Sequence, residues 1–199
     1  MARIQGVPPR QADVYTRIAY RFTRRAIARL TGRETEQMIE PLELYALVPA
    51  LFKGYTKLEQ ATAKAHRLNR RLHALAELKA ATLTHCEYCI DMGSAISRQW
   101  GLSDDEILAL PTYQTSSLFS EVDKLVLDFA VAMSRTTVEV PDQLFDQLRQ
   151  HLDEGQLVEL THHIALENMR GRFNLALGVG SAGFSQGAVC ALPASPEAQ

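Results

Sequence analysis

The sequence has little cysteine, few aromatic residues and almost no net charge. Its 199 residues include three cysteines and one tryptophan, aromatic residues make up 7%, and the formal net charge is −2. Three cysteines are an odd number and too few for a disulfide scaffold. A net charge this small offers no general attraction to nucleic acid or to a membrane surface. We therefore expect no nucleic-acid partner.

Long apolar runs are absent as well. The longest, Leu125–Met133, covers nine residues and is broken by Asp128, whereas a membrane-crossing helix needs about 20 apolar residues. The opening residues, MARIQG, lack the apolar stretch of a secretory signal. We therefore expect no membrane attachment and a cytoplasmic, reducing compartment in which thiols stay reduced.

The apolar residues, 46% of the chain, follow a helical spacing almost throughout. No segment alternates polar and apolar residues over strand length, so the fold class predicted is all-α, a bundle of seven to nine helices. Length and composition fit one domain, residues 1–199. Within it we expect an N-terminal helix in 1–35, a core over about 41–180, and a loop or frayed tail over 181–199.

The helix boundaries are predicted from apolar spacing and from residues that start or stop helices, such as Ser103, which forms a capping box with Glu106. The predicted helical segments are Gln11–Leu30, Pro41 to about Gly54, Tyr55–Ala63, Asn69–Leu83, Cys86–Trp100, Asp104–Leu110, Glu121–Ser134, a segment from Pro141, and Asp153–Leu177.

Charge is distributed unevenly along the chain. Residues 1–40 hold eight arginines and four acidic residues, whereas residues 103–160 hold twelve acidic and three basic residues. We interpret these segments as solvated helix faces or as surfaces that meet between subunits, because no aromatic residues are interleaved with the arginines as in a nucleic-acid site.

Cys86 and Cys89 form a Cys-x-x-Cys pair at a predicted helix start. This spacing brings both sulfurs to one face, close enough for a disulfide. Unpaired amides at a helix N-terminus stabilise a thiolate and lower its pKa. Such a thiolate attacks a peroxide oxygen and becomes a sulfenic acid, which the neighbouring cysteine resolves to a disulfide.

Two other interpretations of the pair stay open. Zinc usually requires a second pair of ligands at matching spacing, and Cys190 stands alone. Alternatively, both thiols are structural, because cysteine is readily buried. We interpret Cys190 as a packed or incidental thiol and expect no bound metal.

The flanking sequence narrows the choice. Four segments resemble those of a known family. They are LAELKAATLTHCEYCIDMGSA at 75–95, WGLSDDEI at 100–107, LVELT at 157–161 and ENMRGRFNLALG at 167–178. Together they resemble the carboxymuconolactone decarboxylase and alkylhydroperoxidase D-like (AhpD-like) family.

The resemblance implies an all-α AhpD-like bundle that assembles as a homo-oligomer, a dimer, trimer or hexamer. It implies an oxidoreductase, either an antioxidant thiol peroxidase with peroxiredoxin-type activity on a hydroperoxide or a disulfide oxidoreductase. Cys89 would be the peroxidatic residue that passes through sulfenic acid, and Cys86 the proton donor and resolving residue. No bound cofactor is expected; an external dithiol, lipoyl-type or thioredoxin-like, would be the reductant.

The sequence departs from the family's redox branch at two positions. That branch carries a glutamate twelve residues before the first cysteine and a histidine four residues after the second, where this chain has Ala74 and Gly93. Glu77 lies on nearly the same helix face as Ala74 and is a candidate relay residue, or else a surface carboxylate. His85, next to Cys86, is a second candidate relay, or else an exposed histidine.

Four further residues are candidates for a substrate pocket. His163, Glu167 and Arg170 share one helix face and either line a pocket beside the cysteines or form an ion-pair network. Tyr88, between the cysteines, is expected to pack in the core or at an interface. Two alternative functions stay open: a redox-responsive scaffold with a degraded proton relay, and a decarboxylase-like lyase that grips a small carboxylic acid with Arg170 or Arg172.

Overall fold

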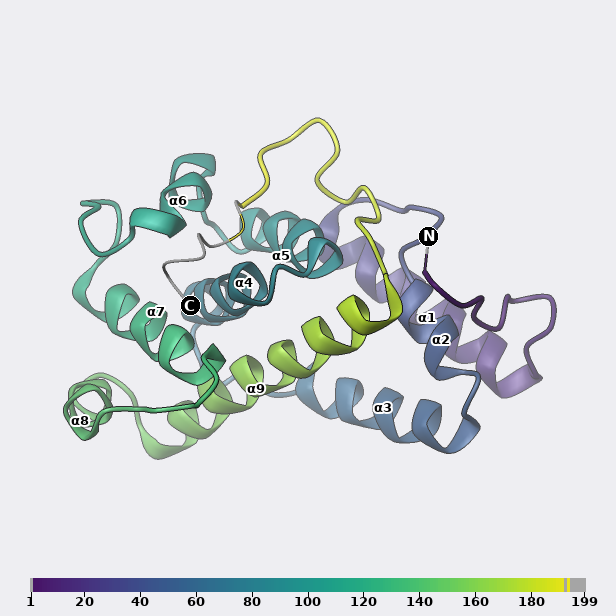
Figure 1. Ribbon diagram of the computed structural model, residues 1–199, viewed down its shortest axis with the longest axis horizontal. Coiled ribbons are helices and arrows are strands. Elements are labelled where there is room, and N and C mark those ends of the chain that lie inside the picture. Colours follow the sequence, from purple (N-terminus) through teal and green to yellow (C-terminus); the bar gives the residue numbers. More distant parts are fainter. Residues whose placement is uncertain (1, 192, 194–199) are drawn as a thin grey trace.

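A computed structural model describes residues 2–191 and 193. Over these residues the chain forms nine α-helices and one 3₁₀ helix, with no strand (Figure 1). The predicted all-α fold, with the cysteine pair at a helix start, is therefore confirmed. The helices are α1 (Val14–Thr31), α2 (Glu40–Tyr45), α3 (Pro49–Thr62), α4 (Arg70–Thr84), α5 (Glu87–Gln99), α6 (Asp104–Ala109), η1 (Leu110–Thr112), α7 (Glu121–Ser134), α8 (Asp142–Arg149) and α9 (Glu154–Leu177).

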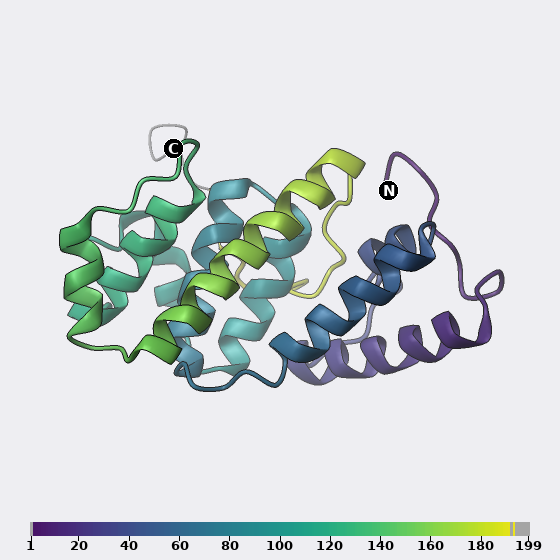
Figure 2. The same cartoon turned by 90° about the horizontal axis from the view of Figure 1, so that it is seen from below.

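Helix α4 is the centre of the bundle. It packs against α5, α7 and α9 (Figures 1 and 2). Its two faces belong to different apolar clusters. Leu75 and Leu78 pack with α1, α2 and α5, whereas Leu72, Ala76 and Ala80 pack with α7, α8 and α9. Because both faces are covered, ten of the fifteen residues of α4 are buried.

Gly93 permits the close packing of α5 on α4. A Cβ atom at this position would lie 3.2 Å from Leu78 Cδ1. The site at which the family's redox branch carries a histidine is therefore filled in this chain by a side chain of the neighbouring helix.

One helix boundary was predicted at the wrong place. The structure ends α2 at Tyr45 and begins α3 at Pro49, so Gly54 and Tyr55 lie inside α3 rather than between two helices. Proline is tolerated in the first turn because the amide it lacks would have no intrahelical partner there. Gly54 is accommodated because an exposed helix interior tolerates glycine at a cost of about 1 kcal/mol.

The segment after α9 is a loop that is anchored to α5. Asp91, 4% exposed, accepts four backbone N–H bonds at 2.6–3.0 Å. The donors are Ala182, Gly183, Phe184 and Ser185. The sequence left a loop and a frayed end as alternatives for this tail. Its described part forms a loop. Residues 192 and 194–199 lie outside the described residues.

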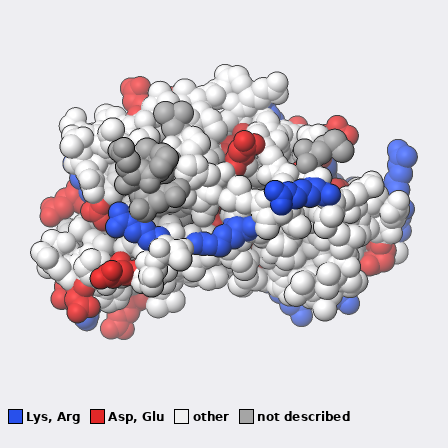
Figure 3. Space-filling view, viewed as in Figure 1, with Lys and Arg blue, Asp and Glu red and all other residues white. Residues whose placement is uncertain are grey.

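The surface reflects the uneven charge of the sequence. Figure 3 shows acidic side chains gathered at the end of the visible face formed by α6 and α8, where Asp104, Asp105, Asp142 and Asp146 are exposed. Among the described residues, no helix combines the length and apolar character needed to cross a bilayer.

Replacing Asp91 by alanine should release the loop. The substitution leaves four backbone donors without their acceptor, and each buried donor left unpaired costs about 1–3 kcal/mol, less where water reaches it. We expect a loss of about 3 kcal/mol in the free energy of unfolding and faster amide exchange over 181–185, measured by urea denaturation and hydrogen-exchange mass spectrometry. Asp105→Ala, at an exposed position, is the control. Unchanged exchange over 181–185 would contradict this role.

Candidate active site

The cysteine pair lies at the N-terminus of α5 as a disulfide. Cys86 is the N-cap residue and Cys89 stands in the first turn, with their Cα atoms 5.2 Å apart. The Cys89 N–H donates to Cys86 Sγ at 3.2 Å. Cys86 is fully buried, whereas Cys89 is 5% exposed. A thiolate formed here would be stabilised by the helix N-terminus.

A tight turn between α4 and α5 positions the cysteine pair. His85 ends α4 in the left-handed region at φ 57°, where its N–H bonds to Thr82 O. The next residue, Cys86, donates to Ala81 O at 3.4 Å, which closes the turn. His85 thus shapes the backbone at the site; its part in a proton relay stays a prediction.

Asn174 of α9 supplies the polar contact to the sulfurs. Its side-chain Nδ2 lies 3.6 Å from both Cys86 Sγ and Cys89 Sγ, and the residue is 3% exposed. An N–H donor aimed at both sulfurs stabilises negative charge on either one. The sequence assigned Asn174 no role, although its position four residues after Arg170 places it on the same helix face.

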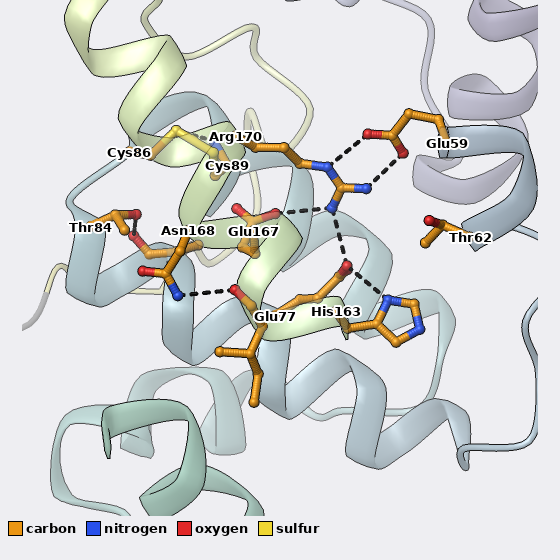
Figure 4. A network of polar contacts seen from close by, with 12 residues as sticks. Glu59, Thr62, Glu77, Thr84, Cys86, Cys89, His163, Glu167, Asn168 and Arg170 are labelled. Atoms are coloured by element: carbon orange, nitrogen blue, oxygen red, sulfur yellow. Dashed lines mark hydrogen bonds and ion pairs between the residues drawn. A yellow bond between two sulfur atoms is a disulfide. The ribbon is translucent and has the colours of Figure 1, made fainter. Parts of the chain in front are cut away.

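Arg170 is the centre of a buried polar network (Figure 4). Its guanidinium makes a two-pronged contact with Glu59 of α3, Nε–Oε1 2.9 Å and Nη2–Oε2 2.7 Å. Its Nη1 lies 3.1 Å from a carboxylate oxygen of Glu77 on α4 and of Glu167 on α9. Three helices are therefore joined at one cation, with the bidentate geometry typical of arginine.

Glu77 lies beside Arg170 and two histidines. Its Oε2 lies 3.2 Å from His73 Nε2, and its Oε1 lies 3.4 Å from His163 Nδ1. Burial by itself would raise the pKa of Glu77, but His73, His163 and Arg170 outweigh burial and hold the pKa well below its usual range. Glu77 therefore stays ionised at neutral pH.

The pKa of Glu167 is shifted in the direction opposite to that of Glu77. Burial raises the pKa of Glu167 to about 7, because it outweighs the attraction of Arg170, and the charges of Glu77 and Glu59 add to the rise. Its Oε1 is buried and has no hydrogen-bond partner among the described residues. Glu167 is thus the carboxyl group of the network that exchanges a proton near neutral pH.

The predicted residues divide between two places. Glu77, His163, Glu167 and Arg170 come together in the ion-pair network between α4 and α9, together with Glu59, which sequence reasoning missed. Tyr88 packs in the core instead; its hydroxyl donates to Met38 O at 2.6 Å and its ring meets Phe184 edge-on. Cys190 lies apart from the disulfide, with its Sγ 3.5 Å from Ser94 Oγ.

A cavity of about 300 Å³ opens beside the C-terminus of α4. Arg172 lines it, but His163, Glu167 and Arg170 do not. The complete lining is Leu83, Thr84, Ser134, Arg135, Thr136, Arg172 and Leu175.

Comparison with known proteins agrees with this geometry. Residues 49–132 match the model of the carboxymuconolactone decarboxylase family. The resemblance to this family is confirmed. The match runs from the start of α3 into α7 and includes the cysteine pair and Glu77.

One curated relative and two solved structures illustrate the similarity. The uncharacterized protein YnjA of Escherichia coli K12 is 29% identical over 170 residues, 82% of this chain and 88% of YnjA. An uncharacterized peroxidase-related protein of Ralstonia eutropha JMP134, described as an alkylhydroperoxidase AhpD core, superposes with a TM-score of 0.71 at 16% identity, over 92% of this chain and 94% of that one. A variant of the debrominase Bmp8 in complex with 2,3,4-tribromopyrrole superposes with a TM-score of 0.70 at 20% sequence identity, over 89% of this chain and 92% of that one. At these identities, the two structures show the AhpD-like fold.

Glu167 should make stability depend on pH. Its pKa of about 7 in the folded chain exceeds the unfolded value of about 4.3, so the folded state binds the extra proton and the free energy of unfolding falls as pH rises through this window. Glu167→Gln cannot titrate. From pH 5 to pH 8, we expect the free energy of unfolding of the wild type to fall by about 2–3 kcal/mol relative to that of Glu167→Gln.

Urea denaturation at several pH values, in buffer with a chelator, measures this shift. Glu139→Gln, at an exposed position, is the control and should show no such trend. A pH-independent difference between wild type and Glu167→Gln would contradict the assignment.

Proposed function

We propose that the protein is a thiol peroxidase that reduces hydroperoxides with the Cys86–Cys89 pair and is itself reduced by an external dithiol. The observation that carries the proposal is the disulfide at the start of α5 with the Asn174 amide on both sulfurs. The confirmed family resemblance and the peroxidase-related fold neighbour support it.

The reaction divides into three balanced steps. The Cys89 thiolate attacks the terminal oxygen of ROOH, so that an S–O bond forms, the O–O bond breaks and the alkoxide takes a proton to leave as ROH. The Cys86 thiol then attacks the Cys89 sulfenic acid, which forms the disulfide and releases water. A dithiol reductant finally exchanges with the disulfide and leaves as its own disulfide.

Exposure favours Cys89 as the attacking residue. It is 5% exposed whereas Cys86 is fully buried, and a hydroperoxide must reach the sulfur that it oxidises. The backbone N–H of Cys89 points at Cys86 Sγ instead, which favours a thiolate on Cys86. The two single variants decide between these assignments.

We propose a proton relay that differs from the one expected from the sequence. Glu77 is committed to Arg170 and to two histidines, so it acts on the thiols only through that network. Glu167 lies seven residues before Asn174, on the same face of α9, and its pKa of about 7 suits a proton carrier at neutral pH. We assign proton transfer to Glu167 and keep Glu77 and His85 as the residues that position the network and the turn.

The remaining partners follow from this cycle. A lipoyl-type or thioredoxin-like reductant in a cytoplasmic compartment fits the final step, and homo-oligomerisation fits the exposed apolar row Val14, Ile18 and Phe22 on α1.

The lyase alternative would use Arg172, which lines the cavity beside α4. The scaffold alternative would form the disulfide without turnover.

Single cysteine variants test the proposal. With an alkyl hydroperoxide and dihydrolipoamide as substrates, we expect Cys89→Ser to lower turnover to background, because the attacking sulfur is lost. Cys86→Ser should trap the Cys89 sulfenic acid, detected with dimedone by mass spectrometry, but should not turn over. Cys190→Ser is the matched control and should keep wild-type turnover.

Three results would count against the mechanism. Full turnover by Cys89→Ser would exclude it. A sulfenic acid trapped in Cys89→Ser rather than in Cys86→Ser would exchange the roles of the two residues. Activity on a small carboxylic acid that survives alkylation of both thiols would favour the lyase.

A further inference from the structure

We propose that His73, Glu77 and His163 form a binding site for a divalent transition metal ion of the zinc class, in the core between α4 and α9. His73 and Glu77 stand one helical turn apart on α4, and His163 faces them from α9. One ligand atom from each residue lies within 4.8 Å of the other two. Facing side chains of neighbouring helices are where helical bundles build metal sites.

The first support is the state of the ring nitrogens. His163 is fully buried, and neither of its ring nitrogens has a hydrogen-bond partner among the described residues. His73 Nε2 is buried and lacks one as well. Their contacts with Glu77 fall at 3.2 and 3.4 Å but do not meet hydrogen-bond geometry. Buried nitrogen atoms left this way are costly, and a cation shared by the three side chains would satisfy them.

The second support is the balance of charge. Four glutamates, Glu59, Glu77, Glu159 and Glu167, belong to the cluster. Within the described part of the chain, Arg170 is the guanidinium group that pairs with three of them, Glu59, Glu77 and Glu167, whereas Glu159 lies beside His163. Buried negative charge must be paired or must coordinate a metal. A divalent cation between the histidines and Glu77 would supply the missing positive charge.

The surroundings of the three residues match an outer ligand shell. Glu159 Oε1 lies 3.7 Å from His163 Nε2, on the far side of the ring from Glu77. A carboxylate behind a metal-bound histidine fixes the ring and its tautomer. The His73 ring stacks on the His163 ring at a centroid distance of 3.5 Å and contacts the Trp100 ring at a centroid distance of 4.7 Å.

The donor set indicates which ions would bind. Two imidazoles and one carboxylate suit zinc and its first-row neighbours rather than calcium or magnesium, which prefer oxygen ligands. Ligand atoms about 2.0–2.1 Å from one tetrahedral zinc ion lie about 3.4 Å apart. Ligand atoms that are now up to 4.8 Å apart must therefore close by up to about 1.4 Å when the ion binds. Three protein ligands leave a fourth position, which water would fill.

The site shares Glu77 with the Arg170 network but does not depend on the thiols. None of its three ligands is a cysteine, so the metal would join α4 to α9 whether or not the peroxidase proposal holds. Reduced cysteines also bind zinc, and the test must therefore be made with a chain in which all three cysteines are replaced by serine.

Metal titration of this cysteine-free chain tests the inference. After removal of metal with a chelator, we expect one equivalent of Zn²⁺ to bind by calorimetry and to raise the melting temperature, because the ion binds the folded state alone. Co²⁺ should give the visible absorption of a nitrogen- and oxygen-ligated ion. Binding should be at least about tenfold weaker in His73→Gln and in Glu77→Gln, both checked for folding by circular dichroism.

His66→Gln, at an exposed histidine, is the matched control and should bind as tightly as its parent. Absence of stoichiometric binding to the folded parent chain would overturn the site. Equal affinity in His73→Gln, Glu77→Gln and the control would overturn it as well.

Discussion

The buried guanidinium of Arg170 is the interaction on which the candidate site depends. It binds carboxylates from α3, α4 and α9 at 2.7–3.1 Å, so the relative positions of three helices are fixed at one point. A buried ion pair adds little net stability over an apolar core, but loss of one partner costs about 3–5 kcal/mol because the other charges stay buried. The network therefore specifies one arrangement of the helices more than it strengthens the fold.

That arrangement places the polar face of α9 over the cysteines. Asn174 follows Arg170 by one turn and reaches both sulfurs. Gly171, between them in the sequence, lies so close to α4 that a Cβ atom there would fall 2.6 Å from Thr84 Oγ1. Arg170 sets the register and Gly171 the distance, so that one amide meets a dithiol on another helix.

Much of the fold could be predicted from the sequence, because its signals are local. The capping box of Ser103 and Glu106 marks the start of α6 as predicted, and the cysteine pair stands at the start of α5. The break before Pro49 was misplaced because a glycine inside a helix resembles a stop in the sequence.

The site was less predictable because its contacts are distant in sequence. Glu59 meets Arg170 across 111 positions, and no spacing rule connects them. Asp91 accepts from amides about 90 residues later in the chain, and no local pattern connects them. Asn174 carries no titratable group, so a search for acids, bases and nucleophiles passed over it.

The central claim is that α9 activates the dithiol through the Asn174 amide. The most direct test is the thiolate pKa of the reduced protein, measured from the pH dependence of iodoacetamide alkylation in wild type and in Asn174→Leu. We expect the reactive thiol of wild type to titrate below the ordinary value of about 8.5 and to return toward that value in Asn174→Leu. The same pKa in both proteins, or an ordinary value in wild type, would contradict the account.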